Sequence, residues 1–416
     1  MVFSCGDSTA DLKTGSPTVT VSGTTATFSA AQTGNIGVGD AVVYTSGTAF
    51  IVAKTSTTVW TVRSATGGNP TAGTNDTVTS IKHAFASLAL ALTGFDGAGF
   101  LNTVDLVAAD IQVDIACYRD SADMTGAQNR TATVITTDAT RFVRIYTPYD
   151  TAVDCNNNQR HNGIWAAQGF LVSHTLSVIT ISVIRDLLME GLQVSMDSVA
   201  NGATAVLLNR NTTEGSVQFR ENLVKVRNTH ASFNQFGLQA NQGSVPMRCA
   251  NNIFWCVITS GGTITAMSET STNGSWFNNT VFGATTGLDR VSGTMTSNNN
   301  LISAATCFNG TQTQSNNAST DATAVGTSPR INQTFTFENS GVGDLRITAA
   351  DAGAKGFGKD LSAAAYPFSI DVVRTTRTVP WDVGAYQVSV AGGVVHLLDR
   401  GTERGLMRGL MRGVVS

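Results

Sequence analysis

The sequence predicts an all-β fold, and within that class a solenoid built from stacked coils of chain. The first observation behind this prediction is composition: 13% of the 416 residues are charged, against roughly 25% in an ordinary soluble domain. Gly, Thr, Ser and Asn, which disfavour helices, are abundant instead. The second observation is a polar corner that recurs between short apolar strands. A net charge of −3 with 42% hydrophobic residues does not match a disordered chain.

Residues 1–80 are predicted to form a small separate β domain. Apolar and polar residues alternate there with a period of two, as expected of strands with one buried face. Gly-containing turns separate the alternating stretches. These stretches are 17–22, 41–44 and 58–62.

Residues 81–96 are predicted to form a capping helix between this domain and the body. Thr79 or Ser80 is a suitable N-cap, and Gly94 is a suitable stop. The apolar residues between them share one helical stripe: Ile81, Phe85, Leu88 and Leu92.

Residues 97–387 are predicted to form the solenoid. In five places an apolar strand leads into a polar corner and a second apolar strand follows. Aligned corners are 31, 30, 27 and 21 residues apart, within the range of solenoid repeats. A β-sandwich or several small β domains would also give regular short strands, and the recurring corner favours the solenoid. The corner residues are Gly191, Asn222, Asn252, Asn279 and Asn300.

This repeat suits a right-handed parallel β-helix, in which each coil forms hydrogen bonds with its neighbours. Asparagine at the same corner of successive coils can bond its own turn and the next, and it tolerates a left-handed backbone. We therefore expect Asn222, Asn252, Asn279 and Asn300 to form a structural ladder. Identical charges stacked about 4.8 Å apart would repel one another, which accounts for the scarcity of charge.

The corners and the end of the body resemble the right-handed β-helix, or pectate-lyase-like, superfamily. The corners contain Asn-Asn-x-apolar, and Asp-Ala-Gly-Ala at 351–354 followed by Trp-Asp-Val-Gly-Ala-Tyr at 381–386 is similar to its closing signature. Gln387 stands where a glutamate is usual. The resemblance implies the fold of 97–387 and leaves activity open, because this superfamily includes lyases, hydrolases, adhesins and phage tailspikes.

Residues 388–416 leave the β-helix pattern and are predicted to be a docking or capping tail. Arginine recurs every four residues with apolar pairs between. A helix is disfavoured, because glycine at the same period costs up to ~1 kcal/mol per residue. We expect the tail to dock on a partner; a cap on the last coil is the alternative, and membrane or nucleic-acid contact a weaker one. The docking residues are Arg404, Leu406, Met407, Arg408, Leu410, Met411 and Arg412.

Catalytic candidates are few. A polysaccharide hydrolase needs two carboxylates about 5–9.5 Å apart, and the weak candidates are Asp186, Glu190 and Glu221. Glu190 and Glu221 are expected to stack in adjacent coils, and plain surface charge is the alternative. Tryptophans offer sugar-stacking surfaces, although burial beneath turns explains them equally well; they are Trp165, Trp255, Trp276 and Trp381.

No metal site and no cofactor is predicted. Cys249 and Cys256 lie seven residues apart without paired histidines, and the six cysteines are expected to be buried free thiols. The sequence carries no phosphate-binding loop and no HExxH motif.

The resemblance, the small N-terminal domain, the tail and the absence of a signal-peptide pattern together favour a non-enzymatic bacteriophage virion protein. Capsid decoration and a tail spike or fibre are both consistent with this expectation; a polysaccharide depolymerase and a bacterial surface adhesin are the alternatives. The expected partners are other capsid or tail proteins, further copies of the chain, with a trimer favoured, and host surface polysaccharide. The expected location is the virion, assembled in the host cytoplasm, with the cell surface as the alternative.

Neither nucleic-acid binding nor membrane insertion is expected. The sequence pI is 5.9, which leaves no basic footprint for nucleic acid. No apolar stretch approaches the ~18 residues of a transmembrane helix.

Overall fold

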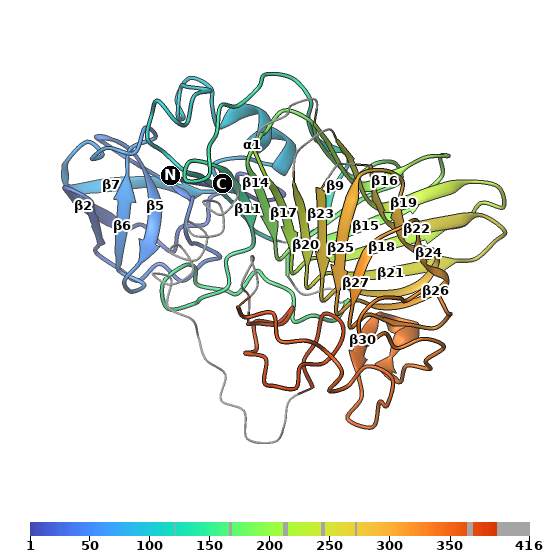
Figure 1. The fold of residues 1–416 in the computed structure, drawn as a ribbon. Helices are drawn as coiled ribbons and strands as arrows, with labels where there is room; N and C mark the ends of the chain where they lie inside the picture. Colours follow the sequence, from blue (N-terminus) through green and yellow to red (C-terminus); the bar gives the residue numbers. More distant parts are fainter. Residues whose placement is uncertain are drawn as a thin grey trace.

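A computed structural model describes residues 1–388, except 121, 166–168, 211–214, 243–245, 271–272 and 364–368. The described chain is almost entirely β, with long parallel sheets. Figure 1 shows a barrel at one side, coloured blue, and a stack of parallel strands extending away from it from green to orange. The described part of the chain ends in a mostly irregular segment, coloured red, that lies against the stack. The predicted all-β class is therefore confirmed.

The N-terminal barrel is closed, in the strand order β2-β3-β6-β5-β4-β7. Its interior is apolar, and Trp60, Val62 and Ile51 are fully buried there. Closure leaves no free sheet edge, which protects so small a β domain from pairing with other chains. The strands are β2 (Thr18–Ser22), β3 (Thr25–Phe28), β4 (Ala41–Tyr44), β5 (Gly47–Lys54), β6 (Val59–Arg63) and β7 (Gly73–Lys82).

The first strand of the chain does not belong to this barrel, which corrects the expectation that all of residues 1–80 form one separate domain. Strand β1 (Val2–Cys5) pairs in parallel with β8 (Val113–Cys117), the first long strand of the body. The reason is burial, since Phe3 and Cys5 point into the apolar core of the body.

The capping helix is shorter than expected and begins later. Helix α1 spans Leu88–Gly94, and the Ser87 hydroxyl accepts a hydrogen bond from the Leu90 amide, so Ser87 is the N-cap. Ile81, expected in the helix, is the second-last residue of strand β7 instead, because its side chain packs in the barrel core. Helix α1 packs against β1 and β10 (Gln128–Arg130) and buries Leu88 in the body core.

The first sheet of the body contains nine parallel strands in the order β1-β8-β11-β14-β17-β20-β23-β25-β27. Each strand pairs in register with the next, so equivalent residues of successive coils lie side by side. Beyond β8, the strands are β11 (Val143–Tyr146), β14 (Leu187–Glu190), β17 (Val217–Arg220), β20 (Met247–Ala250), β23 (Asn273–Phe277), β25 (Thr294–Asn298) and β27 (Thr313–Ser315).

The second sheet has thirteen strands and consists of two stacks that long strands join. The chain visits the first sheet, one stack and then the other before it returns, so the body is solenoid-like. One stack contains β9 (Met124–Thr125), β12 (Leu171–His174), β15 (Gln193–Ser198), β18 (Leu223–Asn228) and β21 (Ile253–Ile258). The other contains β10, β13 (Ile179–Ile181), β16 (Thr204–Arg210), β19 (Asn234–Gln242) and β22 (Thr263–Glu269). The long strands β24 (Thr280–Arg290) and β26 (Leu301–Asn309) follow, and β28 (Ala318–Ser319) pairs with β26.

A row of buried asparagines connects the coils at the corner that follows the first sheet. The side-chain amide of Asn222 donates to Oδ1 of Asn252 at 3.1 Å, and Asn252 donates in turn to Asn279 at 3.0 Å. Asn279 continues the row to Asn300 at 2.9 Å, and Asn300 reaches Asn317 at 3.2 Å. All five side chains are fully buried. Asn317 is a member that the sequence repeat did not single out.

The residue before each ladder asparagine has a positive φ, which completes the sharp corner. Asparagine and glycine adopt this left-handed conformation readily. Gly191, with a φ of 78°, takes the same position one coil earlier, where Leu192 stands in place of a ladder asparagine. Glu221, with a φ of 56°, departs from the pattern. The other members of the column are Asn251, Asn278, Asn299 and Asn316.

The C-terminal segment folds back on this corner. Asp351 accepts hydrogen bonds from its own turn at Gly353 and Ala354. The Gly384 amide donates to the Asn299 carbonyl at 2.7 Å, and the buried Arg377 guanidinium donates to Asn251 Oδ1 at 3.1 Å. The segment also includes the two-stranded sheet of β29 (Phe337–Asn339) and β30 (Asp344–Ile347), with the 3₁₀ turn Ser340–Val342 between them.

Candidate functional site

The glutamate at the end of β14 is an ion-pair centre buried under the outer face of the first sheet. Glu190 is 0% exposed; the Arg144 Nε donates to its Oε1 at 2.7 Å, and the Arg220 Nε donates to its Oε2 at 2.7 Å. Burial alone would raise the pKa of Glu190, but Arg144 and Arg220 hold it well below its usual value. The carboxylate is therefore a permanent counter-ion for two arginines.

Glu221, at the next corner, is held in the same manner. Arg160 donates to its Oε2, and the Arg374 Nη1 lies 3.0 Å from the same oxygen. Both guanidinium groups lie over the ring of Tyr149, with its ring centre 5.7 Å from Arg160 Cζ and 4.8 Å from Arg374 Cζ. This ion-pair arrangement explains why a glutamate occupies a left-handed position that asparagine takes elsewhere in the column.

His161 supports the Glu221 corner as a neutral ring. Burial, with Arg160 beside it, lowers the pKa of His161 to about 3. A neutral ring can donate from Nε2 to the Glu221 carbonyl, 2.9 Å away, and accept at Nδ1 from the Gly163 amide at 3.1 Å. Both ring nitrogens are then satisfied by backbone groups, so His161 fixes the loop in place.

Asp186, the third carboxylate candidate, has hydrogen-bond partners that differ from those of the two glutamates. It accepts hydrogen bonds from the Thr137 hydroxyl and the Ser216 amide, each at 2.9 Å, and is 4% exposed. Glu190 and Glu221 occupy adjacent coils but do not stack as expected, because the register partner of Glu190 is Arg220. Each glutamate is shielded by its own arginine pair. A carboxylate buried in this way does not reach a polysaccharide lying on the surface.

Two of the four tryptophans considered for sugar stacking form a surface cluster. The rings of Trp165 and Trp255 lie 6.4 Å apart, and the Lys225 ammonium sits 5.4 Å from the first and 4.6 Å from the second. Both rings are partly exposed, whereas Trp276 and Trp381 are buried. Burial lowers the pKa of Lys225. The sequence pointed to the two tryptophans but not to their proximity. Trp165 lies in a loop that precedes β18 and β21 by many residues, and only the fold brings it next to them.

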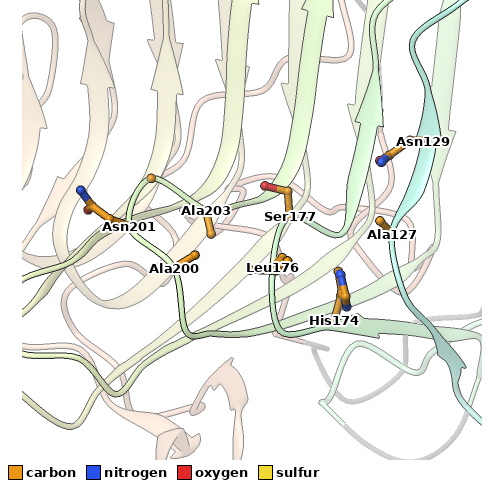
Figure 2. Close-up of a pocket in the computed structure, with 9 residues that line it drawn as sticks. Ala127, Asn129, His174, Leu176, Ser177, Ala200, Asn201 and Ala203 are labelled. Carbon is orange, nitrogen blue, oxygen red and sulfur yellow. The ribbon is translucent and has the colours of Figure 1, made fainter.

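A surface groove of about 380 Å³ lies where the first coils turn from one stack to the other. Figure 2 shows Ala127, Asn129 and His174 toward one end, Asn201 at the other, and Leu176 and Ser177 between them. Three turns form it, after β9, β12 and β15, and its lining contains amides, a hydroxyl, an imidazole and small apolar groups but no carboxylate. Such a lining suits a neutral polar ligand that binds without acid–base chemistry. Beyond its turn residues, nothing in the sequence indicated this groove.

Within the part of the chain that the structure describes, no group of three His, Cys, Asp or Glu side chains is placed to hold a metal ion. No helix among the described residues is long and apolar enough to cross a membrane. All six cysteines are buried free thiols. The predicted docking residues, Arg404 to Arg412, lie outside the described residues.

Comparison with known proteins leaves this chain without a match. No protein-family model matches it, and neither the curated proteins nor the solved structures contain a significant match.

Proposed function

We propose that the body is a right-handed parallel β-helix and that the protein is a non-enzymatic structural component of a bacteriophage virion, projecting from the capsid or the tail. The observation that carries this proposal is the continuous row of buried asparagines from Asn222 to Asn317. A row of hydrogen bonds along the axis resists bending and separation of coils without salt-sensitive surface charge. Stiffness along one axis is what a projecting particle protein requires.

The state of the carboxylates favours structure over catalysis. Glycosidic hydrolysis needs one carboxyl that can give up a proton and a second that faces the sugar. Glu190 and Glu221 are buried between arginines, and the groove has no carboxylate in its lining. We therefore rank the depolymerase alternative below a binding and scaffolding role.

Attachment to host surface polysaccharide would use the groove in this proposal. Its amides and hydroxyl match the neutral hydrogen-bonding groups of sugars, and Leu176 and the alanines offer apolar contact. The proposed virion partners are other capsid or tail proteins and further copies of the chain, with a trimer favoured and the C-terminal tail as the docking element.

Particle purification tests the virion assignment. Particles produced by the source of this sequence are banded on a density gradient, and the chain is sought by mass spectrometry and by gold-labelled antibody. We expect it in the particle band at a symmetric copy number, and its absence from particles would overturn the proposal. Emptied capsids without tails retain a decoration protein and lose a tail protein. Detection on uninfected cells instead would support the surface-adhesin alternative.

Binding of host polysaccharide is tested separately on the purified chain. Ala127→Trp fills one end of the groove, and Ala72→Trp, at an exposed site in the barrel region, is the matched control. With purified capsular polysaccharide or lipopolysaccharide, we expect the first variant to lose binding at least 10-fold and the second to retain it. Release of reducing ends or unsaturated sugars would instead support the depolymerase.

A further inference from the structure

The two cysteines at the junction of the N-terminus and the body form a contacting pair. Cys5 ends strand β1, Cys117 ends strand β8, and the two residues are direct partners in the parallel pairing of these strands. Their Sγ atoms lie 3.6 Å apart, and both residues are 0% exposed. Because paired residues of parallel strands point to the same face, both thiols enter the same core.

The backbone at this pair already satisfies the main requirement for a disulfide. Neighbouring strands hold paired Cα atoms about 4.8 Å apart, inside the roughly 4.4–6.8 Å that disulfides span. Rotation of the two side chains, with little backbone movement, brings contacting sulfurs toward the ~2.05 Å of the bond.

Three of the other four cysteine thiols lie next to oxygen atoms. Cys155 Sγ lies 3.9 Å from the Asp150 carbonyl oxygen, and Cys249 Sγ lies 3.6 Å from Asn279 Oδ1. Cys307 Sγ lies 3.3 Å from the Thr320 hydroxyl. These contacts make the three residues internal controls for selective oxidation.

We propose that Cys5 and Cys117 are a disulfide-forming site, oxidised by a small disulfide such as oxidised glutathione. One thiol, as thiolate, attacks the glutathione disulfide and releases one glutathione; the other then attacks the mixed disulfide and releases the second. The protein loses two protons and two electrons, and one oxidised glutathione takes them up to become two reduced molecules. The bond connects β1 covalently to β8 and encloses the entire barrel and helix α1 in one loop.

Because both thiols are buried, we expect oxidation to require local opening of strand β1. The pKa of Cys117 is raised well above its usual value by burial, so the thiolate is scarce while β1 remains in place. Strand β1 has four residues and lies at the end of the nine-stranded sheet, where local opening is easiest. Oxidation after an opening event then prevents the strand from separating again. This inference does not depend on the proposed virion role.

The test compares purified full-length protein kept in reduced glutathione with protein incubated in oxidised glutathione, at a temperature just below unfolding. Thiols are then blocked and counted under denaturing conditions. We expect six thiols before oxidation and four after it. Trypsin without reductant should yield residues 1–13 joined to residues 83–119, because cleavage follows Lys13, Lys82 and Arg119. The unfolding temperature of the oxidised protein should rise by several degrees.

Variants decide whether the assignment is correct. Cys155→Ser should still form the bond, whereas Cys5→Ser and Cys117→Ser should each form none and show no rise in unfolding temperature on oxidation. Cys5→Ala and Cys117→Ala repeat the test if a buried hydroxyl prevents folding. Six remaining thiols in folded wild type, a bond to another cysteine, or glutathione retained on Cys5 alone would each overturn the proposal.

Discussion

The side-chain amide of Asn252 donates to Oδ1 of Asn279 in the next coil at 3.0 Å, and the same oxygen accepts the backbone amide of Asn252, also at 3.0 Å. One carbonyl thus holds both the side chain and the main chain of the preceding corner. Repetition of this unit along the body couples each coil to its neighbour, because loss of one asparagine leaves groups of two coils unpaired.

Replacement of Asn252 by alanine should therefore be strongly destabilising. The Phe219 carbonyl and the Asn222 amide lose their partner in a fully buried corner. At about 1–3 kcal/mol for each buried unpaired group, we expect a loss of roughly 3–5 kcal/mol. Urea unfolding measures this loss, with Asn69→Ala at an exposed position as the control, expected within about 0.5 kcal/mol of wild type. Equal stability of the two variants would contradict a ladder that holds the coils together.

Replacement of Glu221 by glutamine should destabilise the fold without implicating catalysis. The shape is kept, but Arg160 and Arg374 lose their shared negative partner in a buried site. Breaking a buried ion pair from one side costs about 3–5 kcal/mol, which urea unfolding detects. Glu338→Gln, at an exposed position, is the control and should change little. A Glu221→Gln protein of normal stability that no longer releases sugar from host polysaccharide would favour the depolymerase instead.

Stability should decline above neutral pH because of His83, which joins the barrel to the body. Its Nδ1 lies 2.7 Å from Asp40 and its Nε2 lies 2.9 Å from Asp120. Burial alone would lower the pKa of His83, but these two carboxylates raise it to about 10. A folded-state pKa above the unfolded value of about 6.5 contributes stability that is complete below pH 6.5 and lost as pH rises to 10.

The expected slope is at most about 1.4 kcal/mol per pH unit between pH 7 and 10, or roughly 4 kcal/mol over that range. Denaturant titrations at several pH values measure it in wild type and in His83→Gln. The variant should be less stable at pH 7 and should show a flatter dependence. Parallel pH curves for the two proteins would exclude a charged His83 as the source.

Deletion of residues 401–416 should abolish assembly onto the partner while leaving the fold intact. The tail supplies three regularly spaced arginines and the apolar pairs between them, at Arg404, Arg408 and Arg412. Replacement of these three arginines by alanine in the full-length chain removes their charge but keeps the tail, so it tests whether docking requires the charges. Unchanged assembly by the truncated protein would exclude docking, and a lower unfolding temperature would favour a cap on the last coil.

The repeating features of the fold were readable from the sequence because they follow from local rules. Asparagine at the corners indicated a stack of amides, and Asn222, Asn252, Asn279 and Asn300 lie in one hydrogen-bonded row. The left-handed backbone, expected at the same asparagines, falls on the residue before each of them. The end of β7 and the start of α1 were misplaced, since Ile81 suits a helix stripe and a barrel core equally well. Only packing distinguishes these two environments.

By itself the sequence determined the β class, the corners and the ladder, because periodicity and turn chemistry act between residues close in the chain or at a fixed repeat. Tertiary structure alone decided which charges pair and which thiols meet. Glu221 is paired by Arg374, 153 residues away, and Cys5 meets Cys117 across 112 residues. Such contacts depend on the register and closure of distant segments, which the order of residue types does not encode locally. The ion pairs that remove Glu190 and Glu221 from the surface are therefore a property of the folded chain.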